Sequence, residues 1–417
     1  MLKDPHPSQL NVVTSWCAFL FFALMFAVPS GYSYGAGLLL LASLAGLMKV
    51  PAGVALARED RLIVYVLLFY FIVSAVMVAV HGHPLNDLDQ SSRALLAVPI
   101  LLLLYRHPPA PGKVWAGLAL GVVLSVPVAL WQLYVLHYDR AEGFLNIIHF
   151  GNIALVFGLC CLAGLFWVRL RGRHVGWWRA ALLLGAVAAV YSIMASGSRA
   201  SWVALPPALL LYGIAFVRRR NLGPALAGCL ALVVALGVLF AMPGSPLKAR
   251  YDAAVTDISQ YTHQNEADTS LGARFEMWQG AALAIAERPW LGWSQHDYTE
   301  RLQQRVQQGR LDPIALEFDN NLHNGYMQAW VFQGLPGMLA LLTLYLYPLY
   351  RFCLRLRHSD LAVRVYAYCG AALCSCYVFF TLTQVILRRN NGILFYLLAL
   401  AIFWACMRAA EQRRAPA

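Results

Sequence analysis

The chain has 417 residues, of which 60% are hydrophobic and only 12% are charged. Soluble domains carry about 25% charged residues, so this composition excludes an ordinary soluble globular protein. The formal net charge of +12 does not indicate nucleic-acid binding either, because the basic residues gather in short segments between apolar runs, where they orient membrane spans and meet anionic lipid.

Twelve apolar segments reach or approach the length of about 20 residues that a helix needs to cross a membrane. They are residues 11–28, 33–50, 62–80, 92–105, 114–136, 150–168, 179–195, 201–217, 223–241, 325–350, 363–385 and 392–408. The fourth is short, and the seventh and eighth are separated only by the turn Ser196-Gly197-Ser198-Arg199. The first is followed directly by further apolar segments, so we expect a span and not a cleaved signal peptide. The sequence thus predicts an all-α polytopic membrane protein, one membrane domain over residues 1–417 with about 12 transmembrane helices.

The distribution of lysine and arginine predicts the orientation of these spans. With the N-terminus inside, the short inner segments hold 20 of these residues and the short outer segments hold five. Both termini are therefore expected in the cytoplasm. One long polar stretch, residues 242–322, then lies outside between the ninth and tenth spans, with seven basic and 11 acidic side chains.

This 81-residue stretch is predicted to be helical. Apolar positions recur at helical spacing over residues 251–263 and 270–288, where Pro289 ends the pattern; one such stripe is Leu271, Phe275, Trp278, Ala282 and Ile285. A second amphipathic helix is expected over residues 298–310, with Tyr298, Leu302, Arg305 and Val306. Trp290, Leu291 and Trp293 are expected at the level of the lipid head groups. We therefore expect amphipathic helices that lie on the membrane face and close over a cavity.

The outer side carries three residues suited to chemistry. His323 stands directly before an apolar segment, and its imidazole is the side chain best suited to proton transfer near neutral pH. Arg199 and Arg274 are two guanidinium groups that can bind a pyrophosphate in forked geometry. Each also has a plainer interpretation: a hydrogen-bonded histidine at a helix end, an arginine that snorkels to the interface, and a solvated or ion-paired loop arginine.

Several short motifs resemble one family. His323-Asn324, nine residues, Gly334, two residues and Gly337 resemble the HN-x9-G-x2-G pattern of O-antigen ligases. Upstream, the sequence is similar to the wider O-antigen ligase and polymerase superfamily, although that superfamily often has glycine where Trp293 stands. The similar motifs are Ser198-Arg199, the group of Gly272, Arg274 and Trp278, and Pro289-Trp290-Leu291-Gly292-Trp293. The resemblance covers span number, loop position and roughly residues 196–340.

The resemblance implies an inverting, metal-independent glycosyltransferase with a membrane fold of the GT-C type and no cofactor. It implies transfer of O-antigen polysaccharide from undecaprenyl pyrophosphate to the lipid A–core oligosaccharide, on the periplasmic side of the bacterial inner membrane. His323 would be the general base, and Arg199 and Arg274 would bind the donor pyrophosphate. Arg388 and Arg389 in the last outer segment would be additional donor contacts. The expected partners are these two substrates and membrane lipids, and no nucleic acid.

Other functions stay open at this point. An O-antigen polymerase uses the same donor but tends to have two large outer loops, and a protein O-oligosaccharyltransferase usually adds a soluble C-terminal domain. A secondary transporter would show two related halves, and no such symmetry is visible in the sequence. Asp87-Leu88-Asp89 has the spacing that metal-dependent lipid-linked glycosyltransferases often use, but two carboxylates with one spacer are frequent by chance.

Overall fold

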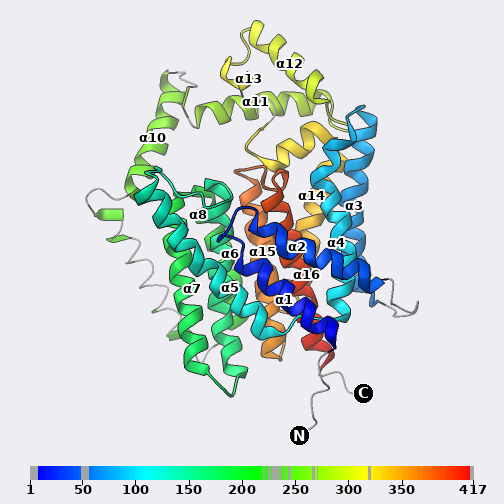
Figure 1. Ribbon diagram of the computed structural model, residues 1–417. Helices are drawn as coiled ribbons and strands as arrows, with labels where there is room; N and C mark the ends of the chain where they lie inside the picture. The colour runs from blue at the N-terminus through cyan, green and yellow to red at the C-terminus, as the bar shows by residue number, and fades with distance from the viewer. Residues whose placement is uncertain are drawn as a thin grey trace.

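The computed structural model describes residues 8–47, 56–218, 221–223, 227, 234, 237–238, 240–242, 246–264, 268–269, 271–317 and 321–413. These residues form a helical bundle with an additional group of helices at one end, and none of them is in a β-strand (Figure 1). The predicted all-α polytopic class is confirmed.

Nine helices within the described residues are long and apolar enough to cross a membrane. They are α3 (Arg58–Val80), η1 with α4 (Leu85–Leu88 and Asp89–Arg106), α5 with η2 (Pro111–Leu130 and Trp131–Val135), α6 with η3 (Ile147–Trp167 and Val168–Leu170), α7 (Val175–Ser196), α8 (Arg199–Phe216), α14 (Gly325–Cys353), α15 (Leu361–Thr381) and α16 (Asn390–Gln412). The predicted break between the seventh and eighth spans is confirmed, because Gly197 ends α7 in the left-handed region at φ 58° and Arg199 begins α8.

Three of the twelve predicted spans are not among these nine helices. Those at 11–28 and 33–50 form helices of only 15 and 17 residues, α1 (Gln9–Ala23) and α2 (Gly31–Leu47). The chain turns between them, with Ser30 at φ 53°, so α1 ends before it reaches the length of a typical bilayer crossing. The predicted span at 223–241 lies largely outside the described residues.

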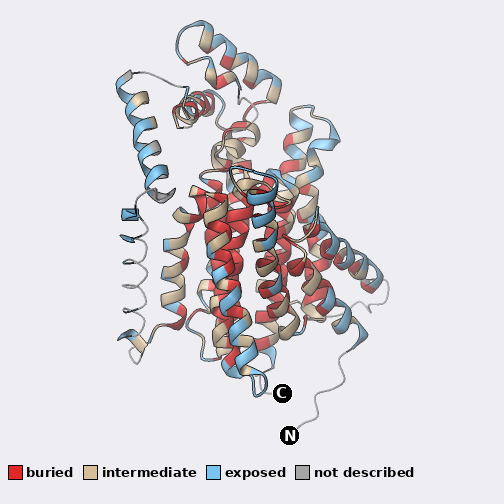
Figure 2. Cartoon of the chain, turned by 60° about the vertical axis from the view of Figure 1, so that its left-hand side comes forward, coloured by how far each residue is buried: buried red, intermediate tan, exposed pale blue. Residues whose placement is uncertain are grey.

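The centre of the bundle consists of α6, α15 and α16. Between 72% and 83% of their most apolar stretches is buried, against 33% for α3, α7 and α8. Figure 2 shows this difference as buried helices inside and partly exposed helices around them. Central helices of this kind are apolar on all sides because each side meets another helix, whereas the outer helices leave an apolar face for lipid.

The two ends of the bundle carry different structures. The described helices of the long loop lie at one end, which we call the loop end, and α16 finishes at the opposite end, which we call the terminal end (Figure 1). These loop helices are α10 (Pro246–Gln264), α11 (Gly272–Glu287), α12 (Gln295–Gln307) and α13 (Ile314–Glu317).

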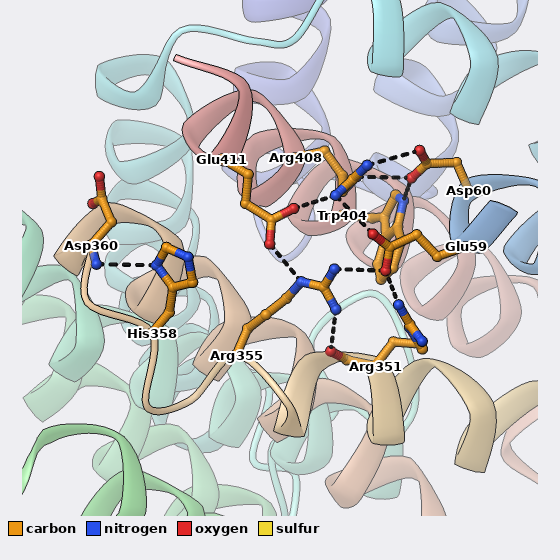
Figure 3. A network of polar contacts seen from close by, with 9 residues as sticks. All are labelled: Glu59, Asp60, Arg351, Arg355, His358, Asp360, Trp404, Arg408 and Glu411. Carbon is orange, nitrogen blue, oxygen red and sulfur yellow. Dashed lines mark hydrogen bonds and ion pairs between the residues drawn. The ribbon is translucent and has the colours of Figure 1, made fainter. Parts of the chain in front are cut away.

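At the terminal end, the start of α3 is joined to the ends of α14 and α16 by a network of ion pairs (Figure 3). We call it the charge cluster, and its residues are Glu59, Asp60, Arg351, Arg355, Trp404, Arg408 and Glu411. Three arginines and three carboxylates take part, so the cluster has no net charge.

Candidate functional site

The long loop is attached to α14 at a kink. α11 ends directly before Pro289, as predicted, and the next five residues run against the helix. The backbone N–H of Trp293 donates to the Val331 carbonyl at 2.7 Å, and the N–H of Leu335 donates to the Pro289 carbonyl at 2.9 Å. These two bonds take up polar groups that a kinked helix leaves open, so the loop and the kink stabilise each other.

Gly334 forms that kink, with φ 62° and ψ −167° in the middle of α14. A Cβ atom at this position would collide with the carbonyl oxygen of Trp290, and the backbone conformation itself is one that L side chains rarely adopt. The first glycine of the HN-x9-G-x2-G pattern is thus the position at which the loop docks on α14.

The buried face of α11 differs from the prediction, whereas Tyr298, Leu302 and Arg305 of α12 are buried as predicted. In α11 the buried stripe is Ala273, Met277, Ala281 and Ala284, which is rotated from the predicted stripe of Leu271, Phe275, Trp278, Ala282 and Ile285. These residues meet Tyr298 and Leu302 of α12 and Val331 of α14 in a separate small core. The apolar faces of α11 and α12 therefore pack on each other and on α14, whereas Tyr251, Val255 and Ile258 of α10 are exposed.

Trp293 is a related correction. It was expected at the lipid head groups with Trp290 and Leu291, but only those two are exposed, at 69% and 52%. Trp293 is 6% exposed, and its indole N–H donates to the Ala284 carbonyl at 2.8 Å. A buried indole N–H needs an acceptor, and the last turn of α11 supplies one.

His323 lies in the short segment between the loop and α14. Asn324 caps α14, since its side-chain oxygen accepts from the backbone N–H groups of Tyr326 and Met327 at 3.0 and 3.2 Å. His323 precedes this cap with φ 47°, a left-handed conformation that is uncommon for a residue with a side chain. The cap and this turn fix the half-buried imidazole at the loop end of the bundle.

Gln384 holds the imidazole from the other side. Its Oε1 lies 2.9 Å from His323 Nδ1, so that Nδ1–H donates to the amide oxygen and Nε2 is the basic nitrogen. Gln384 is 6% exposed and follows the end of α15, 61 residues along the chain. The sequence gives no signal for Gln384, because a single glutamine at a helix end forms no pattern.

Arg274 and His323 line the same cavity, which has a volume of about 390 Å³. We call it the arginine–histidine cavity, and its other lining residues are Asp268, Thr269, Ala273, Met277, Ile314 and Glu317. Burial lowers the pKa of His323, the positive charge of Arg274 lowers it further, and the hydrogen bond to Gln384 opposes both. The imidazole is therefore neutral and able to accept a proton at pH 7.

Arg199 begins α8 and acts electrostatically on the same site. Burial lowers the pKa of Arg274, and the charge of Arg199 lowers it further, which shows that the two guanidinium groups are near enough to repel each other. Within the described part of the chain, neither forms an ion pair or hydrogen bond through its side chain. The structure thus brings Arg199, Arg274 and His323 to one end of the bundle, where Asp268 and Glu317 also line the cavity.

Arg388 and Arg389 do not line the arginine–histidine cavity. Arg388 lines a second, larger cavity, and Arg389 stands at the N-cap of α16. The acidic pair is also divided between partners: Asp87 lies 2.8 Å from His83, and Asp89 lies 2.9 Å from Arg93.

Fold and site define a polytopic helical membrane protein with a group of loop helices at one end of the bundle, beside a cavity lined by arginine and histidine. Residues 184–342 match the model of a family described as O-antigen ligase, and this segment contains Arg199, Arg274 and His323. Over these residues the chain is similar to the O-antigen ligase family.

Two relatives show how far the similarity extends. The chain is 28% identical over 409 residues to a protein of Haemophilus influenzae (strain ATCC 51907 / DSM 11121 / KW20 / Rd) that carries the name "uncharacterized protein". The aligned region covers 97% of this chain and 100% of the relative. It is 27% identical over 166 residues, 39% of each chain, to a protein of Escherichia coli (strain K12) named O-antigen ligase.

Proposed function

We propose that this protein transfers O-antigen polysaccharide from undecaprenyl pyrophosphate to the lipid A–core oligosaccharide, with inversion and without a metal ion. In this proposal the helical bundle is of the GT-C type and lies in the bacterial inner membrane. The loop end then faces the periplasm, with the active site beneath the loop. The family match over residues 184–342 and the name of the Escherichia coli relative support the substrates, and the distribution of basic residues supports the orientation.

One observation carries the mechanism: a neutral imidazole and a guanidinium group share a cavity, with a second guanidinium close by. A pyrophosphate ester needs no activation, but negative charge builds on it as the sugar leaves. Two fixed positive charges in a partly buried site stabilise that charge in the transition state. Arg199 and Arg274 fit this role because the site holds two cations that repel each other until an anion binds between them.

His323 would act on the acceptor. Its Nε2 takes the proton from the acceptor hydroxyl while the oxygen attacks the anomeric carbon from the side opposite the pyrophosphate. The new glycosidic bond forms as the bond from the anomeric carbon to the phosphate oxygen breaks, and undecaprenyl pyrophosphate leaves with the electron pair. Gln384 is a positioning residue in this scheme, because it holds Nδ1–H and thereby keeps Nε2 as the base.

Deletion of the gene tests the function directly, with the lipopolysaccharide analysed on a gel. A ligase predicts that the polymer ladder disappears from the lipopolysaccharide and that free lipid-linked polymer accumulates. Capping of the core with a single repeat would instead identify an O-antigen polymerase. An unchanged ladder would overturn the proposal and favour a protein O-oligosaccharyltransferase or a transporter.

Complementation of the deletion strain with His323→Ala tests the catalytic assignment. General base catalysis contributes about 10²–10⁴ to the rate, so this variant is expected to restore no detectable ladder at normal membrane level. His358→Ala is a matched control, since His358 lies at the terminal end (Figure 3). A normal ladder with His323→Ala would remove this residue as the base. Transfer by the purified enzyme in the presence of a chelator would exclude a metal role for Asp87 and Asp89.

A further inference from the structure

A second cavity lies beside the proposed active site. It has a volume of about 630 Å³ and lies between α3, the start of α4, α14 and the segment after α15. Asn86, Gln90, Gln295, Gln328 and Gln333 contribute five side-chain amides to its lining, so we call it the amide cavity. The mechanism proposed above leaves it unused.

The lining of the amide cavity suits a particular chemistry. Each amide offers both hydrogen-bond donors and an acceptor, and Tyr70, Phe332 and Tyr345 add aromatic surface. The lining contains two charged side chains, Asp87 and Arg388, and Asp87 pairs with His83, which also lines the cavity. Many neutral donors and acceptors together with aromatic and aliphatic side chains match the hydroxyl groups and apolar faces of a sugar better than they match an ion.

The amide cavity continues into a groove at the loop end. This groove, of about 640 Å³, lies between the end of α3 and α12, and it shares His81, His83 and Gln295 with the cavity. His81 Nε2 lies 3.0 Å from the Leu291 carbonyl and so links the end of α3 to the docked loop. Cavity and groove therefore adjoin each other at the loop end, so that a chain of sugars bound in the cavity can extend toward the groove.

The amide cavity also lies close to His323. The backbone N–H of Leu322, directly before His323, donates to the side chain of Gln328 in the cavity wall at 2.9 Å. Gly325 also lines the cavity, and a Cβ there would lie 3.4 Å from the backbone carbonyl oxygen of Gln384. The side chain of the same Gln384 holds the imidazole of His323. One layer of residues therefore separates the amide cavity from the arginine–histidine cavity, with the imidazole between them.

We propose that the amide cavity is a saccharide-binding subsite, which takes the sugar residues next to the reacting hydroxyl or next to the pyrophosphate. It rests on the proposed function, since both substrates of that reaction carry a saccharide. The pyrophosphate binds at Arg199 and Arg274, and the sugars bind through neutral amides on the other side of His323.

The test uses the purified full-length protein and the double variant Gln90→Ala/Gln333→Ala. These amides come from α4 and α14 and form no bond to the residues around His323. Gln307→Ala is the matched control, because Gln307 is an exposed glutamine of α12 that lines neither the cavity nor the groove. Three measurements are made: the KM for the lipid-linked donor, the KM for the lipid A–core acceptor, and the binding of sugar-free undecaprenyl pyrophosphate.

Loss of two neutral hydrogen bonds is expected to raise one KM about tenfold and leave the binding of undecaprenyl pyrophosphate unchanged. A raised KM for the donor assigns the subsite to the transferred polysaccharide, and a raised KM for the acceptor assigns it to the core oligosaccharide. Both KM values within twofold of wild type would overturn the subsite, as would an equal loss of binding for sugar-free undecaprenyl pyrophosphate.

A fourth measurement separates this inference from the proposed function. Lipid-free O-polysaccharide and core oligosaccharide fragments are titrated calorimetrically into the wild type and the double variant. One outcome is a wild type that transfers nothing and still binds a fragment about tenfold more tightly than the double variant does. That result would support the saccharide subsite and contradict the proposed ligase function. A wild type that transfers polysaccharide, but has the same fragment affinity and KM values as the variant, keeps the ligase and overturns the subsite.

Discussion

Arg199 and Arg274 at the loop end differ in their electrostatic surroundings from the arginines of the charge cluster at the terminal end. At the terminal end, Arg355 pairs with Glu59 and Glu411 at 2.6 Å each, and Arg408 pairs with Asp60 at 3.0 Å (Figure 3). At the loop end, Arg199 and Arg274 repel each other and have no carboxylate partner within the described residues.

The difference separates a structural use of arginine from a binding use. The charge cluster joins α3, α14 and α16, helices that are far apart in the sequence, and its charges cancel. Charges that cancel leave no field for a ligand. The two guanidinium groups at the loop end are not ion-paired with described residues, and in the proposed function they bind the pyrophosphate.

The largest expected effect is on folding, from Asp60→Ala. Asp60 is 3% exposed and accepts from both Arg408 and the indole N–H of Trp404. Its removal leaves Arg408 with fewer partners in a half-buried site, and breaking a buried pair in this way costs about 3–5 kcal/mol. The variant should be far less resistant to thermal denaturation in detergent, while transfer per folded molecule stays close to wild type.

Asp139→Ala provides the matched control for this stability measurement. Asp139 is exposed between α5 and α6, and surface changes of this kind usually stay within about 0.5 kcal/mol. If Asp60→Ala were as stable as Asp139→Ala, the charge cluster would have no structural role and the comparison would fail.

Next in size is the effect of Arg274→Ala, on transfer and not on folding. Loss of one group that stabilises developing charge lowers the rate by about 10²–10³. Arg274 forms no ion pair with a described residue, so its removal should leave thermal stability nearly unchanged. Arg310→Ala, an exposed arginine of the same loop, is the control and should transfer at the wild-type rate. Wild-type transfer by Arg274→Ala would show that the pyrophosphate binds elsewhere.

The smallest expected effect is a shift of the pH–rate profile, which tests the assignment of His323 as the base. Only neutral His323 accepts a proton, so the rate falls as pH drops through the pKa of this residue, which the wild type holds below the usual histidine value. Gln384→Glu places a carboxylate next to Nδ1, stabilises the imidazolium and raises this pKa. The acid limb of the rate profile should move up by about one pH unit.

Two further variants show whether this shift comes from His323. Gln384→Ala removes the hydrogen bond that raises the pKa, so its acid limb should not move upward even though its rate falls. Gln307→Glu adds a carboxylate on exposed α12 and should keep the wild-type profile. An unmoved profile in Gln384→Glu would contradict the role of Gln384 at the base.

Much of the architecture follows from the sequence because its signals are local. Apolar length predicted the helices from α3 to α8 and from α14 to α16, and the turn before Arg199 ends α7 as expected. Pro289 stops α11, since proline cannot continue a helix, and α10 and α12 lie where the periodicity placed them to within a few residues. His323, Arg199 and Arg274 were named from their residue types and from the family motifs around them, and their roles remain predictions.

Tertiary structure alone decided what long-range contacts control. Periodicity shows that α11 has an apolar face, but only packing against α12 and α14 selected the stripe at Ala273 and Met277 and buried Trp293. Gln384 meets His323 across 61 residues, and Asp60 meets Arg408 across 348. No local pattern encodes such pairs, because each depends on where the whole bundle places two distant helix ends. The need for glycine at 334 is likewise explained only when the loop backbone at Trp290 lies against it.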